Sequence, residues 1–350
     1  MENQVKRTYI CKDVSAYKMD CNIPASYKVK AGDVGLFEVL RIGKHKNVQG
    51  STKRNITIMP GDLIMAAFGT RYATEQFEGY LPERLDEELH ILGAGGTVGV
   101  LASMHNKFRD IGPTSLRFAG FAVDHFGQII NTKSIKRKLQ VPFSGTAAAA
   151  TKVILSLGSS MDSGKTTSAA YLVHGLKKAG MKVAYIKLTG TVYTKDADLA
   201  WDLGADVVAD FGDFGFPSTY LCSEEELLSL YESLIKSVLH CQPDYVVIEV
   251  ADGLYQRETK MLLQSNSFIN TVDKVIFSAG DSLAALNGVQ LLKRWGIHPL
   301  FLSGLLTASP LLIQEVKENC SIPVFTIEDL AGGADVMDIL SSSTLMVSNQ

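Results

Sequence analysis

Nine consecutive residues near the middle of the chain have the composition of a loop that binds phosphate. They are Ser159, Ser160, Met161, Asp162, Ser163, Gly164, Lys165, Thr166 and Thr167. Small side chains let successive backbone N–H groups turn toward phosphate oxygens, and a helix beginning behind them adds the partial positive charge of its N-terminus. In such a loop Lys165 bridges the β- and γ-phosphates, and the Thr166 hydroxyl coordinates Mg²⁺. The residues therefore predict Mg²⁺–nucleotide binding, against the alternative of a chance Gly-Lys-Thr at a helix start.

The chain on either side of the loop supplies the strand and the helix that this motif requires. The apolar run 152–158 predicts a buried strand, and the stretch 164–179 predicts a helix directly behind the loop. One detail departs from the usual GxxxxGK[ST] pattern, because Ser159 stands in the place of the first glycine and the glycine is displaced to Gly158.

A second apolar run, 244–249, ends in the carboxylate of Glu249. A carboxylate at the C-terminal end of a buried parallel strand lies where open α/β sheets bind their ligands. We interpret Glu249 as a metal ligand that acts directly or through water. The alternative is a buried acid stabilised by a helix N-terminus.

The second half of the chain alternates strands and helices. Apolar runs predict strands at 152–158, 182–190, 206–212, 244–253, 274–280, 298–306 and 322–327, with helices around 164–179, 197–203, 224–240, 282–295 and 310–319. This pattern is typical of an α/β fold, a mostly parallel, doubly wound sheet covered by helices on both faces.

The first half has a different pattern. Short β-rich segments at 34–42, 55–69, 89–102, 115–124 and 127–133, punctuated by glycine, predict a smaller barrel- or sandwich-like domain. The stretch 93–99 approaches the GxGxxG pattern of dinucleotide-binding loops but lacks its last glycine, so we interpret it as a tight turn of the barrel. The weakly charged stretch 141–151 predicts a linker. We therefore expect a β-rich domain over 1–146 and a nucleotide-binding domain over 147–350.

Composition narrows the classes of function. The 350 residues are 46% hydrophobic and 20% charged, which excludes a disordered or fibrous chain. A formal net charge of -3 provides no basic field for a nucleic-acid backbone, so no nucleic-acid partner is expected. We find no signal peptide and no apolar run of about 18 residues that could span a bilayer, so we expect a cytoplasmic protein without a membrane partner.

Together these motifs resemble one branch of the P-loop NTPases. The spacing within the loop, Lys187 at the end of the second strand, and Glu249 followed by Asp252 are similar to the dethiobiotin synthetase branch, which also holds the MobB-like molybdopterin-guanine-dinucleotide accessory GTP-binding proteins and the cobyrinic acid amidases. The resemblance covers only residues 150–330, because the β-rich half has no counterpart in dethiobiotin synthetase. Ser160 stands where partition-type ATPases carry an early lysine, so a dimer-switch ATPase is not expected.

Four further side chains receive roles from the resemblance or from their expected place at the C-terminal ends of the parallel strands. The resemblance implies that Lys187 reaches the γ-phosphate or an anionic substrate, although a strand-end lysine is often only solvated. It also implies a second Mg²⁺ ligand, for which we choose Asp198 over Asp196, with a helix-capping aspartate as the alternative. Asp252 and Arg257 would hold an acceptor; the planar fork of Arg257 suits a carboxylate or phosphate, and a surface Arg–Glu pair is the alternative.

Two functions remain in competition, and the sequence favours the first. The first is a Mg-ATP-dependent enzyme that transfers a phosphoryl group to a small carboxylate- or amine-bearing metabolite, or activates that metabolite for ligation, with Lys165, Lys187, Asp252 and Arg257 as catalytic residues. The second is a nucleotide-dependent regulatory or accessory NTPase that docks a protein partner through the β-rich domain. ATP is favoured by its frequency in the branch, while GTP and a homodimer stay open. The glycine- and aromatic-rich loop 210–220 would close over a substrate or plug a domain contact.

Overall fold

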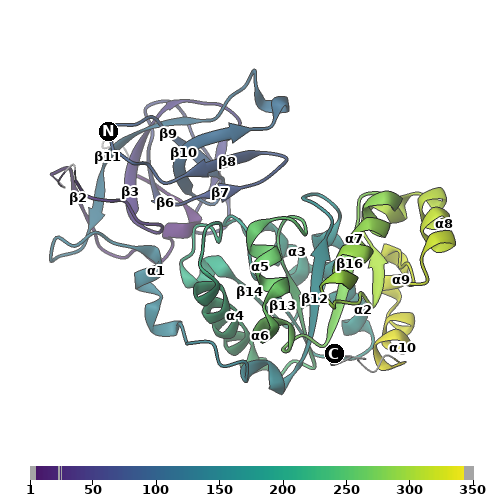
Figure 1. Ribbon diagram of the computed structural model, residues 1–350. Coiled ribbons are helices and arrows are strands. Elements are labelled where there is room, and N and C mark those ends of the chain that lie inside the picture. The colour runs from purple at the N-terminus through teal and green to yellow at the C-terminus, as the bar shows by residue number, and fades with distance from the viewer. Residues whose placement is uncertain (1–4, 23, 25, 343–350) are drawn as a thin grey trace. The chain divides into compact units, whose positions relative to one another are not determined.

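The computed structural model describes residues 5–22, 24 and 26–342 and divides the chain into two compact units. The β-rich unit comprises Met1–Gln140, Gly190–Thr194 and Phe211–Leu221, and the P-loop unit comprises Val141–Thr189, Lys195–Asp210 and Cys222–Gln350. The β-rich unit is mainly purple to blue in Figure 1, and the P-loop unit runs from teal to yellow. The first unit thus ends six residues before the expected boundary at 146/147, and it includes two segments that we expected in the second domain.

Short strands make up most of the β-rich unit. They are β1 (Lys6–Arg7), β2 (Lys18–Asp20), β3 (Val34–Arg41), β4 (Asn47–Gln49), β5 (Asn55–Thr57), β6 (Leu63–Phe68), β7 (Arg71–Tyr72), β8 (Phe77–Tyr80), β9 (Leu89–Gly93), β10 (Thr97–Met104) and β11 (Ser115–Val123). Helical turns are η1 (Tyr9–Cys11), η2 (Asn106–Phe108), α1 (Thr132–Ile135) and η3 (Arg137–Leu139). The expected strand at 127–133 is wrong, because this stretch forms only isolated bridges at Ile129 and Asn131 before α1 begins.

The pairing of five of these strands closes on itself. Strand β6 pairs with β3, β3 with β11, β11 with β9, β9 with β10, and β10 again with β6. A closed circuit of this kind is a small barrel, which leaves no open edge among those strands. Its interior contains Phe37, Phe68 and Phe121, all fully buried. The barrel alternative of the sequence prediction therefore describes this unit, and the stretch 93–99 contains the turn 94–96 between β9 and β10.

The P-loop unit alternates strands and helices as expected. Its strands are β12 (Lys152–Gly158), β13 (Val183–Lys187), β14 (Val207–Asp210), β15 (Tyr245–Glu249), β16 (Lys274–Ser278) and β17 (Phe301–Ser303). Its helices are α2 (Lys165–Lys178), α3 (Lys195–Asp202), α4 (Glu224–Val238), α5 (Arg257–Gln264), α6 (Asn266–Ile269), α7 (Ser282–Arg294), α8 (Pro310–Asn319), α9 (Ile327–Gly332) and α10 (Ala334–Ser342). The 3₁₀ turns in this part of the sequence are η4 (Ala147–Ala150), η5 (Phe211–Phe214, within the β-rich unit), η6 (Leu239–Cys241) and η7 (Leu305–Ala308).

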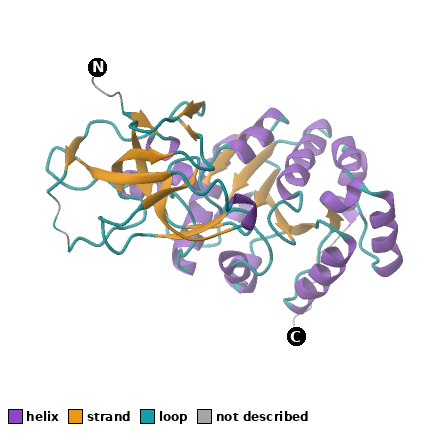
Figure 2. Ribbon diagram, turned by 90° about the horizontal axis from the view of Figure 1, so that it is seen from above, coloured by secondary structure: helices purple, strands orange, loops and turns teal. Residues whose placement is uncertain are grey.

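The six strands form one parallel sheet in the order β14-β13-β15-β12-β16-β17. Figure 2 shows helices on both sides of it, which confirms the expected α/β class. On one face, α2, α3, α9 and α10 share a core with Ile154, Tyr185 and Val247 of the strands. The expected last strand at 322–327 is wrong, since only Val324 bridges to Leu302.

No helix in the described part of the chain is long and apolar enough to cross a membrane.

A buried carboxylate holds the first residues of the P-loop unit. Glu232 of α4 is fully buried and accepts from the Ser144 hydroxyl at 2.5 Å, the Gly145 N–H at 3.2 Å and the Ala147 N–H at 3.3 Å. The stretch expected to be a linker is thus fixed to the body of the unit.

Candidate functional site

The loop between β12 and α2 is tightly folded. A Cβ at Gly158 would lie 2.4 Å from Ser163 Oγ, and Asp162 (φ +57°) and Gly164 (φ +94°) both adopt left-handed backbone conformations. These values show that the backbone curls back over the end of the strand, as a loop around phosphate oxygens must. Ser163 is 1% exposed, and its hydroxyl has no hydrogen-bond partner among the described residues. An unpartnered buried donor in this loop fits an anionic ligand.

Two neighbouring backbones hold the loop in place. The Leu305 N–H donates to the Ser163 carbonyl at 3.1 Å, and a Cβ at Gly304 would lie 2.3 Å from that same oxygen. A Cβ at Gly253 would lie 2.4 Å from the Ser159 carbonyl oxygen. Glycine is therefore required at both positions, because any side chain would displace the loop.

The first turn of α2 directs two polar side chains to the strand ends. Lys165 is 6% exposed and donates from Nζ to the Ser160 carbonyl at 2.5 Å, and Thr166 donates from Oγ1 to Glu249 Oε1 at 2.8 Å. Burial lowers the pKa of Lys165, and the negative charges of Glu249 and Asp252 partly oppose that shift. The structure thus brings together five of the residues selected from the sequence, namely Ser160, Lys165, Thr166, Glu249 and Asp252.

Lys187 joins the same cluster from the adjacent strand. Its register partner on β15 is Glu249, and its Nζ lies 2.6 Å from Glu249 Oε1 and 2.7 Å from Asp196 Oδ2. Tyr185 donates its hydroxyl to Glu249 Oε2 at 2.5 Å. Burial lowers the pKa of Lys187, but the carboxylates of Asp196 and Glu249 outweigh burial and raise the pKa above its ordinary value. Lys187 is therefore a permanent ammonium group and not a strand-end lysine in solvent.

Two members of this cluster were not selected from the sequence. Tyr185 lies two residues before Lys187, so its side chain leaves the strand on the same face, and that period of two was the available signal. Asp196, which we placed second to Asp198, is the aspartate of α3 that reaches Lys187. The metal role of Asp198 stays a prediction.

The two residues expected to hold an acceptor, Asp252 and Arg257, have different surroundings. The charge of Asp252 acts on Lys165, so this carboxylate belongs with the cluster. Arg257, on the first turn of α5, instead donates to the Cys222 carbonyl at 2.9 Å and forms an ion pair with Glu258. These contacts agree with the alternative that we gave for Arg257. Its acceptor role stays a prediction.

The described residues contain no group of three or more His, Cys, Asp or Glu side chains arranged to hold a metal ion. One hydroxyl and one carboxylate, Thr166 and Glu249, are in contact at the loop. Oxygen donors of this kind fit Mg²⁺, which usually takes only one or two protein ligands beside phosphate and water.

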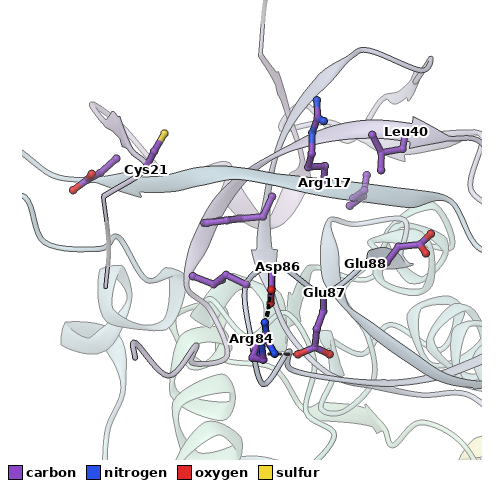
Figure 3. Close-up of a pocket in the computed structure, with 11 residues that line it drawn as sticks. Cys21, Leu40, Arg84, Asp86, Glu87, Glu88 and Arg117 are labelled. Carbon is purple, nitrogen blue, oxygen red and sulfur yellow. Dashed lines mark hydrogen bonds and ion pairs between the residues drawn. The ribbon is translucent and has the colours of Figure 1, made fainter. Parts of the chain in front are cut away.

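A separate hollow of about 820 Å³ lies in the β-rich unit. Figure 3 shows Arg84 pointing toward Asp86 and Glu87 on one side of it, with Leu40 and Arg117 on the other. Arg84 pairs with Asp86, and Arg117 pairs with Glu38. Both guanidinium groups of this hollow are therefore already paired with carboxylates.

The comparisons with known proteins give limited similarity. No protein-family model matches the chain, and no curated protein is similar to it in sequence. Among solved structures it is similar to the signal recognition particle receptor FtsY from Elizabethkingia anophelis, at 17% identity and a TM-score of 0.36 over 61% of this chain and 75% of that one. It is also similar to a DUF1611 family protein from Anabaena variabilis, at 13% identity and a TM-score of 0.41 over 58% of this chain and 61% of that one. A third similar structure is the hydrogenase maturation factor HypB from Archaeoglobus fulgidus, at 12% identity and a TM-score of 0.36 over 60% of this chain and 97% of that one.

Proposed function

We propose that the protein is a P-loop NTPase that binds a Mg²⁺–nucleotide, ATP or GTP, at residues 159–167. The observation that supports this most is the contact of Thr166 with Glu249 beside the curled loop that carries Lys165. Thr166 would hold Mg²⁺, with Glu249 acting directly or through water, and the bound ion would supply positive charge against the phosphates. Lys165 would exchange the Ser160 carbonyl for phosphate oxygens.

Lys187 would contribute charge rather than proton transfer. Its raised pKa keeps the ammonium form across the physiological range, so it cannot serve as a general base there. A fixed ammonium beside the phosphate loop instead opposes negative charge that develops during phosphoryl transfer, which is the main requirement of this chemistry. Asp196 and Glu249 position it.

Of the two functions in competition, we propose the regulatory or accessory NTPase. The chain leaves the P-loop unit after Thr189, contributes residues 190–194 to the β-rich unit, and returns at Lys195, next to the Asp196 that binds Lys187. Within the β-rich unit the Gln49 side chain donates to Thr194 Oγ1 at 2.8 Å and accepts from the Thr194 N–H at 3.2 Å. A change at Lys187 on nucleotide binding would therefore act on a segment held by the other unit.

The metabolite kinase or ligase of the dethiobiotin synthetase branch is the second candidate. The position of Asp252 near Lys165 favours it, because an amine acceptor bound there would face the phosphates. The contacts of Arg257 with Cys222 and Glu258 weigh against a bound carboxylate acceptor.

Thermal shift with Mg-ATP and Mg-GTP tests the binding site. Nucleotide should raise the melting temperature of the parent protein, because a ligand held only by the folded state stabilises it. Lys165→Ala should remove that rise. Equal shifts in parent and variant would contradict the proposed site.

Hydrogen exchange of the peptide containing 190–194 tests the regulatory function. Nucleotide should change its exchange in the parent protein, and Gln49→Ala should reduce that change without altering nucleotide affinity. Gln128→Ala, at an exposed position of the same unit, is the matched control. A metabolite that stimulates nucleoside diphosphate release, with exchange at 190–194 unchanged, would instead establish the second candidate.

A further inference from the structure

Lys44, in the connection after β3, has an unusually fixed backbone. Its N–H donates to the Gly112 carbonyl at 2.9 Å. On either side, Thr114 Oγ1 accepts from the Gly43 N–H at 2.9 Å and donates to the His45 carbonyl at 2.7 Å. These bonds set the direction in which the Lys44 side chain leaves the chain.

That direction places the amine beside two aromatic rings and a side-chain amide. Nζ lies 4.9 Å from the ring centroids of both Phe77 and Phe108 and donates to Gln76 Oε1. Arg71, only 8% exposed, donates from Nη2 to the same oxygen at 2.7 Å. Two cationic side chains thus converge on one neutral acceptor.

The other charged groups around Lys44 do not neutralise the positive charges of Lys44 and Arg71. Lys107 Nζ lies 5.5 Å from the Phe108 ring centroid and is bonded to Glu75 Oε2 at 2.8 Å. His105 lies 3.6 Å from the same carboxylate oxygen. The Glu75 carboxylate is therefore engaged by Lys107 and His105, and within the described residues no carboxylate forms an ion pair with Lys44.

The protonation of Lys44 follows from these surroundings. Burial, with help from the positive charges of Arg71 and Lys107, lowers the pKa of Lys44 to about 7. The adjacent His45 adds no charge at neutral pH, because burial and the positive charges of Lys44 and Arg71 hold its pKa well below the ordinary value. At pH 7 about half of Lys44 is a free amine, against roughly three in ten thousand for a lysine at its ordinary pKa.

We propose that Lys44 is a site of reversible carbamate formation with carbon dioxide. The nitrogen lone pair attacks the carbon, an N–C bond forms, one C=O electron pair moves to oxygen, and the amine proton passes to water. The step converts a group that is unfavourable as a cation into an anion beside Arg71 and Lys107. Burial disfavours either charge, but the positive charges of Arg71 and Lys107, which disfavour the ammonium form, favour the anionic product.

The test uses the full chain and [¹³C]bicarbonate at pH 7. A ¹³C carbamate signal should appear with the parent protein, and alkylation that traps the carbamate should place the adduct on Lys44 in mass spectrometry. Lys44→Arg should lose the signal, whereas Lys46→Arg, at an exposed neighbouring position, should keep it. Lys107→Met should lower the carbamate occupancy of Lys44 several-fold, because it removes a cation near the product. Lys107→Arg keeps that positive charge and should keep the occupancy of the parent protein.

A second measurement needs no variant. Competitive acetylation of the parent protein across pH should give half-maximal reactivity of Lys44 near pH 7. At that pH the free-amine fraction of Lys44 is about a thousand times that of a lysine with the ordinary pKa. Labelling of Lys44 at the same rate as the exposed lysines, or trapped adducts spread evenly over them, would overturn the proposal.

Discussion

Replacing Lys187 by methionine should strongly destabilise the nucleotide-free protein. The side chain of Lys187 is 9% exposed and that of Glu249 is 1% exposed, so the pair is shielded from water. Removing one partner of a buried ion pair costs about 3–5 kcal/mol, because the other charge is left uncompensated. Here Glu249 keeps its bonds from Thr166 and Tyr185 but loses the opposing charge. For a unit of about 200 residues, such as the P-loop unit, that cost corresponds to a fall of roughly 6–20 °C in melting temperature.

The assay is thermal unfolding followed by circular dichroism, with Lys177→Met as the matched control. Lys177 pairs with Asp206 at 2.8 Å, but both side chains are about 30% exposed, so its loss should cost no more than about 1 kcal/mol. Adding Glu249→Gln to Lys187→Met should recover part of the stability, since it removes the stranded charge. Equal losses in the Lys187 and Lys177 variants would refute the account of the cluster.

Three further predictions concern other parts of the chain. Gly304→Ala should lower nucleotide affinity about tenfold or more in a binding titration, because its Cβ would displace the Ser163 carbonyl, while Gly280→Ala, with open space around it, should not; equal affinities would contradict the tight loop. Glu232→Ala should cost about 3 kcal/mol in urea unfolding, since three hydrogen bonds to its carboxylate are lost and the buried Ala147 N–H loses its acceptor; a loss below 1 kcal/mol would contradict its anchoring role. Lys44→Met should be more stable than the parent below pH 7, with an advantage that disappears as pH rises toward 10.5, because the unfolded chain binds the proton that the folded chain releases in that window; a pH-independent difference would contradict the lowered pKa.

Much of the site could be predicted because its parts obey local rules. A turn of mostly small residues between an apolar strand and a helix fixes Lys165 and Thr166, and the common edge of parallel strands brings Lys187 to Glu249. Which aspartate of α3 faces Lys187 depends on the rotation of a short helix, and the sequence does not determine it. Asp196 is the aspartate that pairs with Lys187, and the metal role that the resemblance implied for Asp198 stays a prediction.

The division of the chain could not be predicted in the same way. Residues 190–194 follow a strand that belongs to the P-loop unit, and nothing in their composition marks a change. Their assignment depends on distant partners such as Gly95, where a Cβ would lie 2.1 Å from the Val192 carbonyl oxygen. Arg257 was likewise assigned by its chemistry, whereas its partner, the Cys222 carbonyl, is a backbone atom that sequence patterns do not reveal.

The two segments that complete the β-rich unit also affect how the chain is made. Thr97 donates to the Pro217 carbonyl at 2.9 Å and Thr132 to the Gly215 carbonyl at 2.6 Å, so this unit lacks internal partners until residue 221 has been synthesised. A ribosome adds about 5–20 residues per second, and about 80 residues separate Gln140 from Leu221. The first unit therefore spends several seconds of synthesis without these two segments, with Phe211, Phe214 and Phe216 still absent from it. Translation speed between these positions, rather than the order of the units along the gene, would set when the N-terminal half can first fold.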